Sequence, residues 1–125
     1  MYSIILKKYN LYFFLVASTI LLASDEVTNQ KELAIHYFMQ GEFLLNQGNY
    51  ALAVLEFQDA IQIDPNASTI HISIADAYRR LGRAKHAEDH LRIAIDLDPE
   101  DLSSREMLGH LYLINRKSGE LVHEI

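Results

Sequence analysis

The chain has 125 residues, of which half are hydrophobic, a formal net charge of −6 and no cysteine. This length supports one domain, and the apolar fraction is too high for a disordered chain. The acidic balance disfavours nucleic-acid binding, because the phosphate backbone carries the same sign of charge. The absence of cysteine excludes disulfides, thiolate metal sites and a cysteine nucleophile.

The N-terminal segment has the layout of an export signal. Lys7 and Lys8 precede an uncharged run from Tyr9 to Ser24, and two acidic residues follow this run. A secretory signal has an apolar stretch of about 7–15 residues, whereas a full membrane span needs about 20. The run lies between these lengths, so we expect residues 1–24 to be a cleaved signal peptide or a short membrane anchor.

Either form of the N-terminal segment would export the rest of the chain. The remainder would then be periplasmic, secreted or anchored to the membrane, with the two lysines left on the cytoplasmic side. The alternative is a buried apolar helix that packs on the rest of the chain.

Beyond residue 24, apolar residues recur at helical spacing in successive short segments. Thr28 is the expected N-cap of a helix that reaches Gln47, and Gly48 then ends it. Proline disfavours helical geometry at the residue before it, so Pro65 and Pro99 mark two further helix ends. The predicted helices cover residues 28–47, 50–63, 68–81, 84–97 and 101–115.

A short motif occurs twice, 34 residues apart. Residues 60–65 read Ala-Ile-Gln-Ile-Asp-Pro, and residues 94–99 read Ala-Ile-Asp-Leu-Asp-Pro. Glycine, alanine and aromatic or leucine positions elsewhere keep the same offset. A fixed period of this size marks an array of repeats, each of them a pair of helices.

On these positions the chain resembles the tetratricopeptide repeat family from residue 34 onward. The resemblance implies an all-α fold, a right-handed α-solenoid of antiparallel helix pairs that follows an N-terminal apolar helix. The expected repeat domain is 25–125, with repeats at 34–67 and 68–101 and a partial repeat at 102–125. The matching positions are Gly41, Leu44, Gly48, Ala53, Phe57, Ala60 and Pro65, then Ala75, Tyr78, Gly82, Ala87, Leu91, Ala94 and Pro99, then Gly109 and Tyr112.

Small residues in these repeats have an expected structural role. Gly41, Ala75 and Gly109 should lie where the second helix of each pair crosses the first closely, and the larger residue three positions later should fill the space beside them. The second repeat departs from the family pattern at His71, where a large apolar residue is usual.

The third repeat is incomplete. Arg116 replaces the turn glycine and Leu121 replaces a small alanine, so at most half of a second helix can form. Part of the first helix should then lose its cover, namely Leu108, Leu111, Tyr112 and Ile114. Three explanations stay open: a longer gene product, another copy or partner on the exposed face, or last residues that fold back.

In the family, the first helices line a concave trough that binds partners. The resemblance places on it Phe38, Glu42, Leu45, Asn46, Ile72, Asp76, Arg79, Arg80 and His110, with Ile35, Thr69, Ser103, Glu106, Leu113 and Ile114 at the other equivalent positions. One branch of the family captures the C-terminal carboxylate of heat-shock chaperones with lysine and asparagine at the positions held here by Phe38 and Glu42, so that clamp is absent.

A trough that mixes apolar and charged groups suits an extended segment or a helix of a partner protein. The alternative is that these residues are ordinary solvent-facing side chains of a stacking module.

Candidate catalytic chemistry is weak. His86 and His90, one helical turn apart, could share a metal, but the neighbouring acids do not follow the order of zinc peptidases. We therefore expect both histidines on a solvated outer face. His110 could approach Asp76, and such a pair is expected to be a surface contact rather than a general base.

The sequence therefore predicts a non-catalytic scaffold or adaptor that binds a protein or peptide and needs no cofactor or metal. The N-terminal segment is the part expected to contact a membrane. The alternatives are a module that self-associates, for example as a homodimer, through the third repeat, and a fragment of a longer repeat protein.

Overall fold

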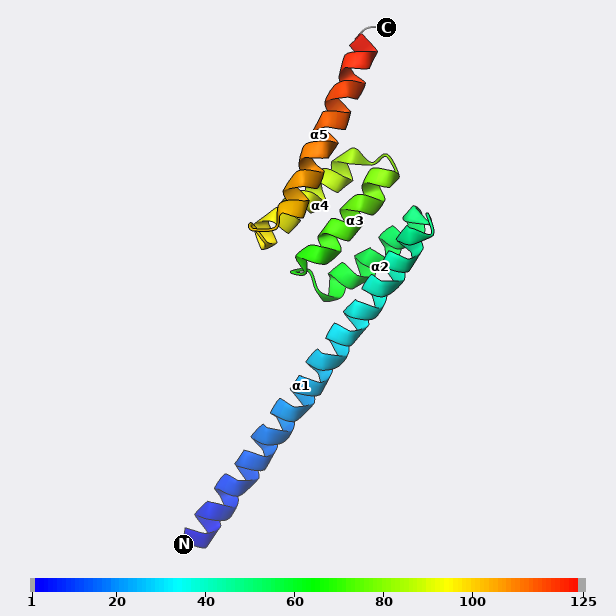
Figure 1. The fold of residues 1–125 in the computed structure, drawn as a ribbon. Helices are drawn as coiled ribbons and strands as arrows, with labels where there is room; N and C mark the ends of the chain where they lie inside the picture. The colour runs from blue at the N-terminus through cyan, green and yellow to red at the C-terminus, as the bar shows by residue number, and fades with distance from the viewer. Residues whose placement is uncertain (1, 124–125) are drawn as a thin grey trace. The chain divides into compact units, whose positions relative to one another are not determined.

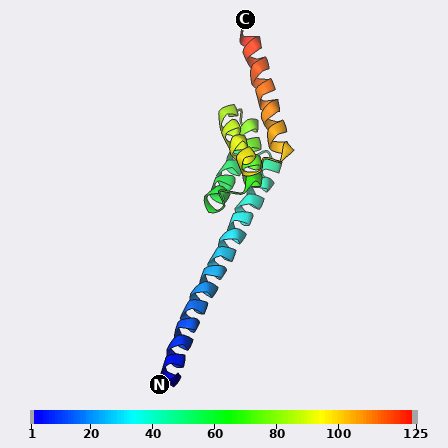
Figure 2. The ribbon, with the colours of Figure 1, turned by 90° about the vertical axis from the view of Figure 1, so that its left-hand side faces the viewer.

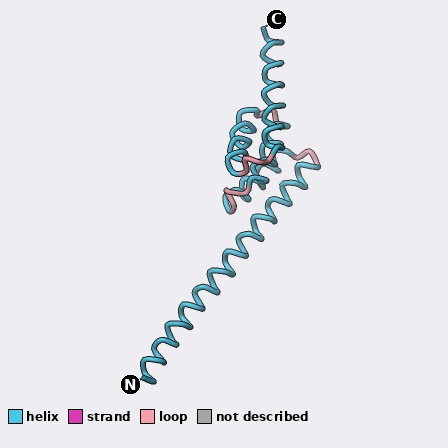
Figure 3. The backbone as a smooth tube through the Cα atoms, turned by 60° about the vertical axis from the view of Figure 1, so that its left-hand side comes forward, coloured by secondary structure: helices cyan, strands magenta, loops and turns pink. Residues whose placement is uncertain are grey.

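The structure is a computed structural model that describes residues 2–123, with the side chains of residues 118 and 120–123 outside the described part. Five helices make up this range: α1 (Tyr2–Asn46), α2 (Tyr50–Ile63), α3 (Ser68–Arg80), α4 (Ala84–Leu97) and α5 (Leu102–His123) (Figure 1). Only short loops separate them, and residues 2–123 contain no strand (Figure 3). The all-α prediction is confirmed. The chain divides into two compact units, one up to Glu32 and the other from Leu33.

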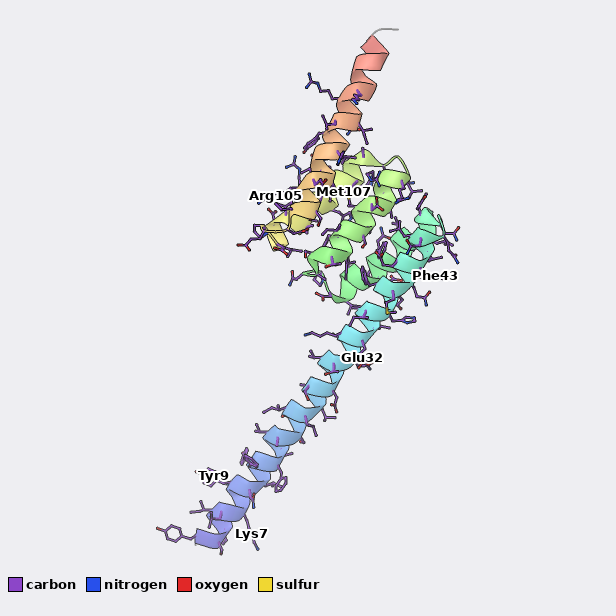
Figure 4. The ribbon with its side chains drawn as sticks, in the orientation of Figure 1. Lys7, Tyr9, Glu32, Phe43, Arg105 and Met107 are labelled. Carbon is purple, nitrogen blue, oxygen red and sulfur yellow. The ribbon has the colours of Figure 1, made fainter. Side chains whose placement is uncertain are left out.

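The first unit is the N-terminal part of α1. Its large apolar side chains are exposed around the helix, as Figure 4 shows near Lys7 and Tyr9. The hydroxyls of Ser18 and Thr19 donate to the carbonyls three residues back, at 2.9 and 2.8 Å. Length and composition make α1 the one helix in the described range that could cross a membrane.

The predicted helix start at Thr28 is wrong. The Thr28 hydroxyl donates to the carbonyl of Ser24 at 2.9 Å, so it lies inside α1 and caps nothing. Residues 24–32 contain neither glycine nor proline, and extending an existing helix is easier than nucleating a new one. The helix therefore continues through the segment where a cap was expected.

In the second unit, the turns inside the first two repeats form as predicted. Gly48 and Gly82 have positive φ angles of 81° and 74°. At each turn the glycine and the residue after it donate back to the helix in the pattern of a Schellman motif. The longer of these links run from Asn49 N to Leu44 O and from Arg83 N to Tyr78 O, both at 2.9 Å. Glycine is required here because a side chain would strain this left-handed conformation.

Consecutive helices of this unit pack against one another, α2 on α3, α3 on α4 and α4 on α5 (Figure 2). The core consists mainly of the predicted repeat positions, since Ala53, Phe57, Ala60, Ala75, Tyr78, Ala87, Leu91 and Ala94 are all buried. A Cβ atom added at Gly41 would lie 2.5 Å from the ring of Phe57. The close crossing predicted at Gly41 is therefore confirmed.

The third repeat differs from its prediction. Helix α5 continues past Asn115 and through Arg116 to His123, so the expected turn and half helix do not form within the described backbone. The two turns that do form need glycine at positive φ, and arginine at the equivalent place favours continued helix. The expectation for the Leu121 side chain lies outside the described residues.

Losing the second helix changes the role of two repeat positions. No described atom outside the backbone of α5 lies within 4 Å of a Cβ added at Gly109, so no described helix crosses closely there and the predicted close crossing is wrong. Tyr112 is 42% exposed and fills no gap. Exposure of Tyr112 and Ile114 was predicted correctly, whereas Leu111 is buried and Leu108 is half-buried against the core, so the predicted loss of cover is wrong for these two leucines.

Candidate functional site

A hollow of about 390 Å³ lies between α3 and α5. Arg79 of α3 lines one side, and α5 contributes the others: Ser103, Glu106, Met107, His110 and Ile114. All of these except Met107 (labelled in Figure 4) occupy positions predicted for the trough. The structure therefore brings Arg79 and His110, from consecutive first helices, to one mixed apolar and charged surface.

Asp76 does not pair with His110 as the sequence suggested. Its two carboxylate oxygens accept hydrogen bonds from Nε of Arg79 at 3.1 Å and Nε of Arg80 at 3.0 Å. The acid is thus engaged by cations of its own helix, one turn away. These partly exposed pairs orient the arginines and contribute little stability.

The two arginines point to different places. Arg79 lines the hollow, whereas the guanidinium of Arg80 lies 5.5 Å from the ring centre of Tyr50 on α2. Its hydrogen bonds to Tyr50 and then to Asp76 raise the pKa of Arg80, so it stays charged. Arg80 therefore joins α3 to α2, and Arg79, which is also bound to Asp76, is the arginine that lines the hollow.

The other trough positions, on α1 and α3, differ in how deeply their side chains are buried. Phe38 and Leu45 are half-buried and pack against the core, with the Phe38 ring centre 6.0 Å from that of Phe57. Asn46 is exposed and Ile72 of α3 is half-buried. Phe38 and Leu45 thus contribute to folding as well as to any surface.

Glu42 has a free acceptor. Its Oε1 atom is buried and has no hydrogen-bond partner. A buried polar atom without a partner carries a desolvation cost of about 1–3 kcal/mol, and most are satisfied in folded proteins. A donor supplied by a bound partner would satisfy this oxygen.

The prediction that both histidines of α4 lie on a solvated outer face is wrong for His90, which is half-buried, whereas His86 is exposed. The rings of His86 and His90 both stack on Tyr78 of α3, with centroids 5.0 and 5.7 Å away. His90 also lies 3.1 Å, Nδ1 to Nδ1, from the buried His71. The sequence feature that could have predicted this contact is the polar His71, which stands where the repeat pattern has an apolar residue.

The described residues hold no group of three or more histidine and acidic side chains arranged for a metal ion. The histidine cluster is therefore a packing and hydrogen-bonding feature between α3 and α4.

Comparisons with known proteins agree with this architecture. A family model described as "Tetratricopeptide repeat" matches residues 44–112. Superkiller protein 3 of Schizosaccharomyces pombe is 29% identical over 79 residues, which is 63% of this chain and 6% of that protein. The CTR9 homolog of Arabidopsis thaliana is 29% identical over 91 residues, 73% of this chain and 8% of that protein. The chain thus spans less than a tenth of these relatives.

Solved structures share the fold. The second TPR of Spaghetti (RPAP3), bound to the HSP90 peptide SRMEEVD, has a TM-score of 0.69 and 23% identity, and covers 77% of this chain and 88% of its own. The first TPR of the same protein, with the same peptide, has a TM-score of 0.67, 22% identity and coverages of 70% and 69%. A MamA double mutant has a TM-score of 0.64 and 21% identity, with coverages of 66% and 46%.

Proposed function

Because the chain belongs to the tetratricopeptide repeat family, we propose that it is a non-catalytic adaptor that binds a segment of a partner protein along its first helices. The observation that carries this proposal is the hollow between α3 and α5, which combines Arg79 and His110 with the apolar Met107 and Ile114. Such a surface can hold an apolar anchor and orient it with polar contacts.

The partner chemistry follows from Glu42 of α1, another position that the family register assigns to the trough. The two RPAP3 structures hold an acidic peptide, but this chain has Glu42 with an unsatisfied oxygen in its trough. A lysine, arginine or amide group of the partner would donate to that oxygen. The proposed ligand is therefore a segment with an apolar side chain for the hollow and a hydrogen-bond donor for Glu42.

Site-specific photocrosslinking tests this proposal. A photoreactive amino acid replaces His110, which lines the hollow, or Leu55, which is exposed on α2 and outside the hollow. The full chain in its own cells should crosslink to a defined protein from position 110 and much less from position 55. The Glu42→Gln and Arg79→Glu changes should each reduce the crosslink at position 110. Equal crosslinking yields from positions 110 and 55 would refute the hollow as a binding surface.

We propose in addition that residues 1–24 are a retained membrane anchor and that the repeats are held on the far side of the membrane. Three observations support it: the lysines before the apolar run, the hydroxyls of Ser18 and Thr19 satisfied within the helix, and the lack of a helix break at residue 24. Lipid offers no water, so a spanning helix must satisfy its own polar groups.

Mass spectrometry and membrane partition of the chain, expressed with its own N-terminus, test the anchor. An intact mass in an alkali-washed membrane pellet is expected. A mass reduced by the leader, in a soluble exported fraction, would show a cleaved signal peptide instead.

Self-association through α5 is the second candidate function. It is favoured by the exposure of Tyr112 at 42%, Leu113 at 56% and Ile114 at 52%, beside the open Gly109. Sedimentation equilibrium in density-matched detergent should then give a mass between one and two chains that rises with concentration, and Leu113→Glu should abolish the rise. A constant mass of one chain would exclude it.

A further inference from the structure

Two histidines from neighbouring helices face each other inside the second repeat. His71 of α3 is 4% exposed, and its Nδ1 lies 3.1 Å from Nδ1 of His90 on α4. The ring centroids are 5.4 Å apart, which exceeds the nitrogen–nitrogen distance by about two ring radii. The two nitrogens therefore point almost straight at each other.

This head-on geometry fits an N–H···N hydrogen bond and not a metal clip. Zinc–nitrogen bonds are about 2.0–2.1 Å long, so a metal on this line would hold the nitrogens about 4 Å apart. The observed distance is shorter and leaves room for one hydrogen only.

The turn between α2 and α3 fixes the direction of that hydrogen bond. Nε2 of His71 lies 2.8 Å from the carbonyl oxygen of Pro65. A carbonyl oxygen only accepts, so Nε2 of His71 carries hydrogen and, in the neutral ring, its Nδ1 is bare. The hydrogen between the rings therefore belongs to Nδ1 of His90, and the chain of bonds runs from α4 through α3 to Pro65.

The groups around His90 disfavour its positive charge. The pKa of His90 is lowered first by burial and then by His71, with a smaller contribution from His86, while Asp89 acts in the opposite direction. Asp89 is itself bound to Lys85 at 2.9 Å. The neighbouring α3 presents the Tyr78 ring, stacked at 5.7 Å, and α2 adds the neutral Gln58, which donates to the Tyr78 hydroxyl at 3.0 Å.

We propose that His71 and His90 form a proton-sensitive clasp that ties α3 to α4 and to the turn at Pro65. One hydrogen lies between the two Nδ1 atoms of the neutral pair, and Nε2 of His90 can accept one further proton. A second further proton would place two N–H groups head to head at 3.1 Å, on two positive rings, and the clasp would open.

The sign of the pH dependence follows from the same groups. In the unfolded chain the ring of His90 takes up a proton at its ordinary pKa of 6.5, whereas in the folded chain the pKa of His90 lies below this value. The unfolded chain therefore binds more protons below that pH. The stability that the clasp contributes is complete above pH 6.5 and is lost as the pH falls below it.

Nuclear magnetic resonance tests the hydrogen bond itself. In the full chain in detergent micelles, with 15N-labelled histidine, we expect a scalar coupling between the two Nδ1 nuclei and a protonated Nδ1 on His90 at pH 7.5. Both signals should disappear by pH 5. A bare Nδ1 on His90 at pH 7.5, without the coupling, would overturn the proposal.

Thermal unfolding at pH 7.5 and 5.5 tests the consequence. Between pH 7.5 and 5.5, the melting temperature of the wild-type chain should fall by about 5 °C more than that of the His71→Leu variant. His86→Gln is the matched control, because His86 is an exposed histidine on the same helix and stacks on the same Tyr78 ring. Because His86 makes the smallest contribution to the pKa of His90, this variant should keep most of the wild-type pH dependence. Equal losses in wild type and His71→Leu would overturn the proposal.

If His71→Leu does not fold, His90→Gln replaces it. The glutamine amide can donate to Nδ1 of His71 but does not titrate in this range. The melting temperature of this variant should also fall less between pH 7.5 and 5.5 than that of the wild-type chain. An equal fall would count against the clasp.

Discussion

Tyr78 in the second repeat and Tyr112 in the third occupy the same position of the 34-residue period, but their surroundings differ. Tyr78 is 6% exposed and lies between α2 and α4, while Tyr112 is 42% exposed and is bonded only to the surface side chains of Arg92 and Glu88 among the contacts described. The repeat pattern assigns both residues the same role. The difference shows that burial at a repeat position is supplied by the helix that packs on it from the next place in the array, and within the described residues no such helix covers Tyr112.

The third repeat is stabilised in another way. Helices α2, α3 and α4 begin without a side-chain cap. At the start of α5, the Asp101 carboxylate accepts from the backbone N–H of Ser103 at 3.2 Å and of Ser104 at 3.3 Å, and from both hydroxyls. A helix with fewer packing partners thus gains an N-cap of the usual kind.

Truncating each tyrosine to alanine should give the largest difference in stability between the second and third repeats. Tyr78→Ala removes a buried ring and should lower the free energy of unfolding by about 3–5 kcal/mol. Tyr112→Ala removes an exposed ring and should cost about 1 kcal/mol or less. Urea unfolding of both variants, as full chains in the same detergent, gives the difference. Equal losses would mean that the third repeat is packed like the second.

Gly41→Ala tests the close crossing in the first repeat. The new methyl group would lie 2.5 Å from the Phe57 ring, so the helices must separate or the ring must move. We expect a loss of about 1–3 kcal/mol from overpacking. A melting temperature equal to that of the wild-type chain would show that Phe57 gives way without cost.

Gly109→Ala is the matched change in the third repeat and should act in the opposite direction. No described atom outside the backbone of α5 lies within 4 Å of the new methyl group, and alanine is favoured over glycine inside a helix by about 0.5–1 kcal/mol. The same urea experiment should therefore show a small gain in stability. A loss would reveal a helix or partner close to Gly109.

The smallest expected effect concerns the cap of α5. The hydrogen bonds from Ser103 and then Ser104 lower the pKa of Asp101 to about 2. Because the pKa is depressed, the carboxylate stabilises the folded chain above pH 3.8 and loses this effect as the pH falls through about 2. Asp101→Ala should lower the melting temperature at pH 7 by less than Gly41→Ala does. Asp101→Asn, which still caps but does not titrate, should retain most of the stability.

The sequence predicts the first two repeats well because their signals are local. Glycine at positions 48 and 82 and proline at 65 and 99 end helices by backbone geometry alone, and the ends of α2 and α4 agree with the prediction. The trough positions follow from the family register, and five of them line the hollow beside Met107.

The wrong predictions concern residues whose role was assigned from their place in the 34-residue repeat or from their polarity alone. Arg116 stands at a turn position but lies inside α5, and Thr28 resembles a cap but lies inside α1. His90 looked like a surface residue because its partner, His71, lies 19 residues away on another helix. The unsatisfied oxygen of Glu42 is likewise visible only once its neighbours are placed.

One aromatic ring also bears on how the domain unfolds. Tyr78 accepts a hydrogen bond from Gln58 of α2 and stacks on His86 and His90 of α4, so it belongs to the contacts on both sides of α3. In linear arrays, cooperativity depends on the coupling between neighbouring units. Sharing one ring between two interfaces makes their loss a single event, so α2, α3 and α4 should open together while the ends of the array fray independently.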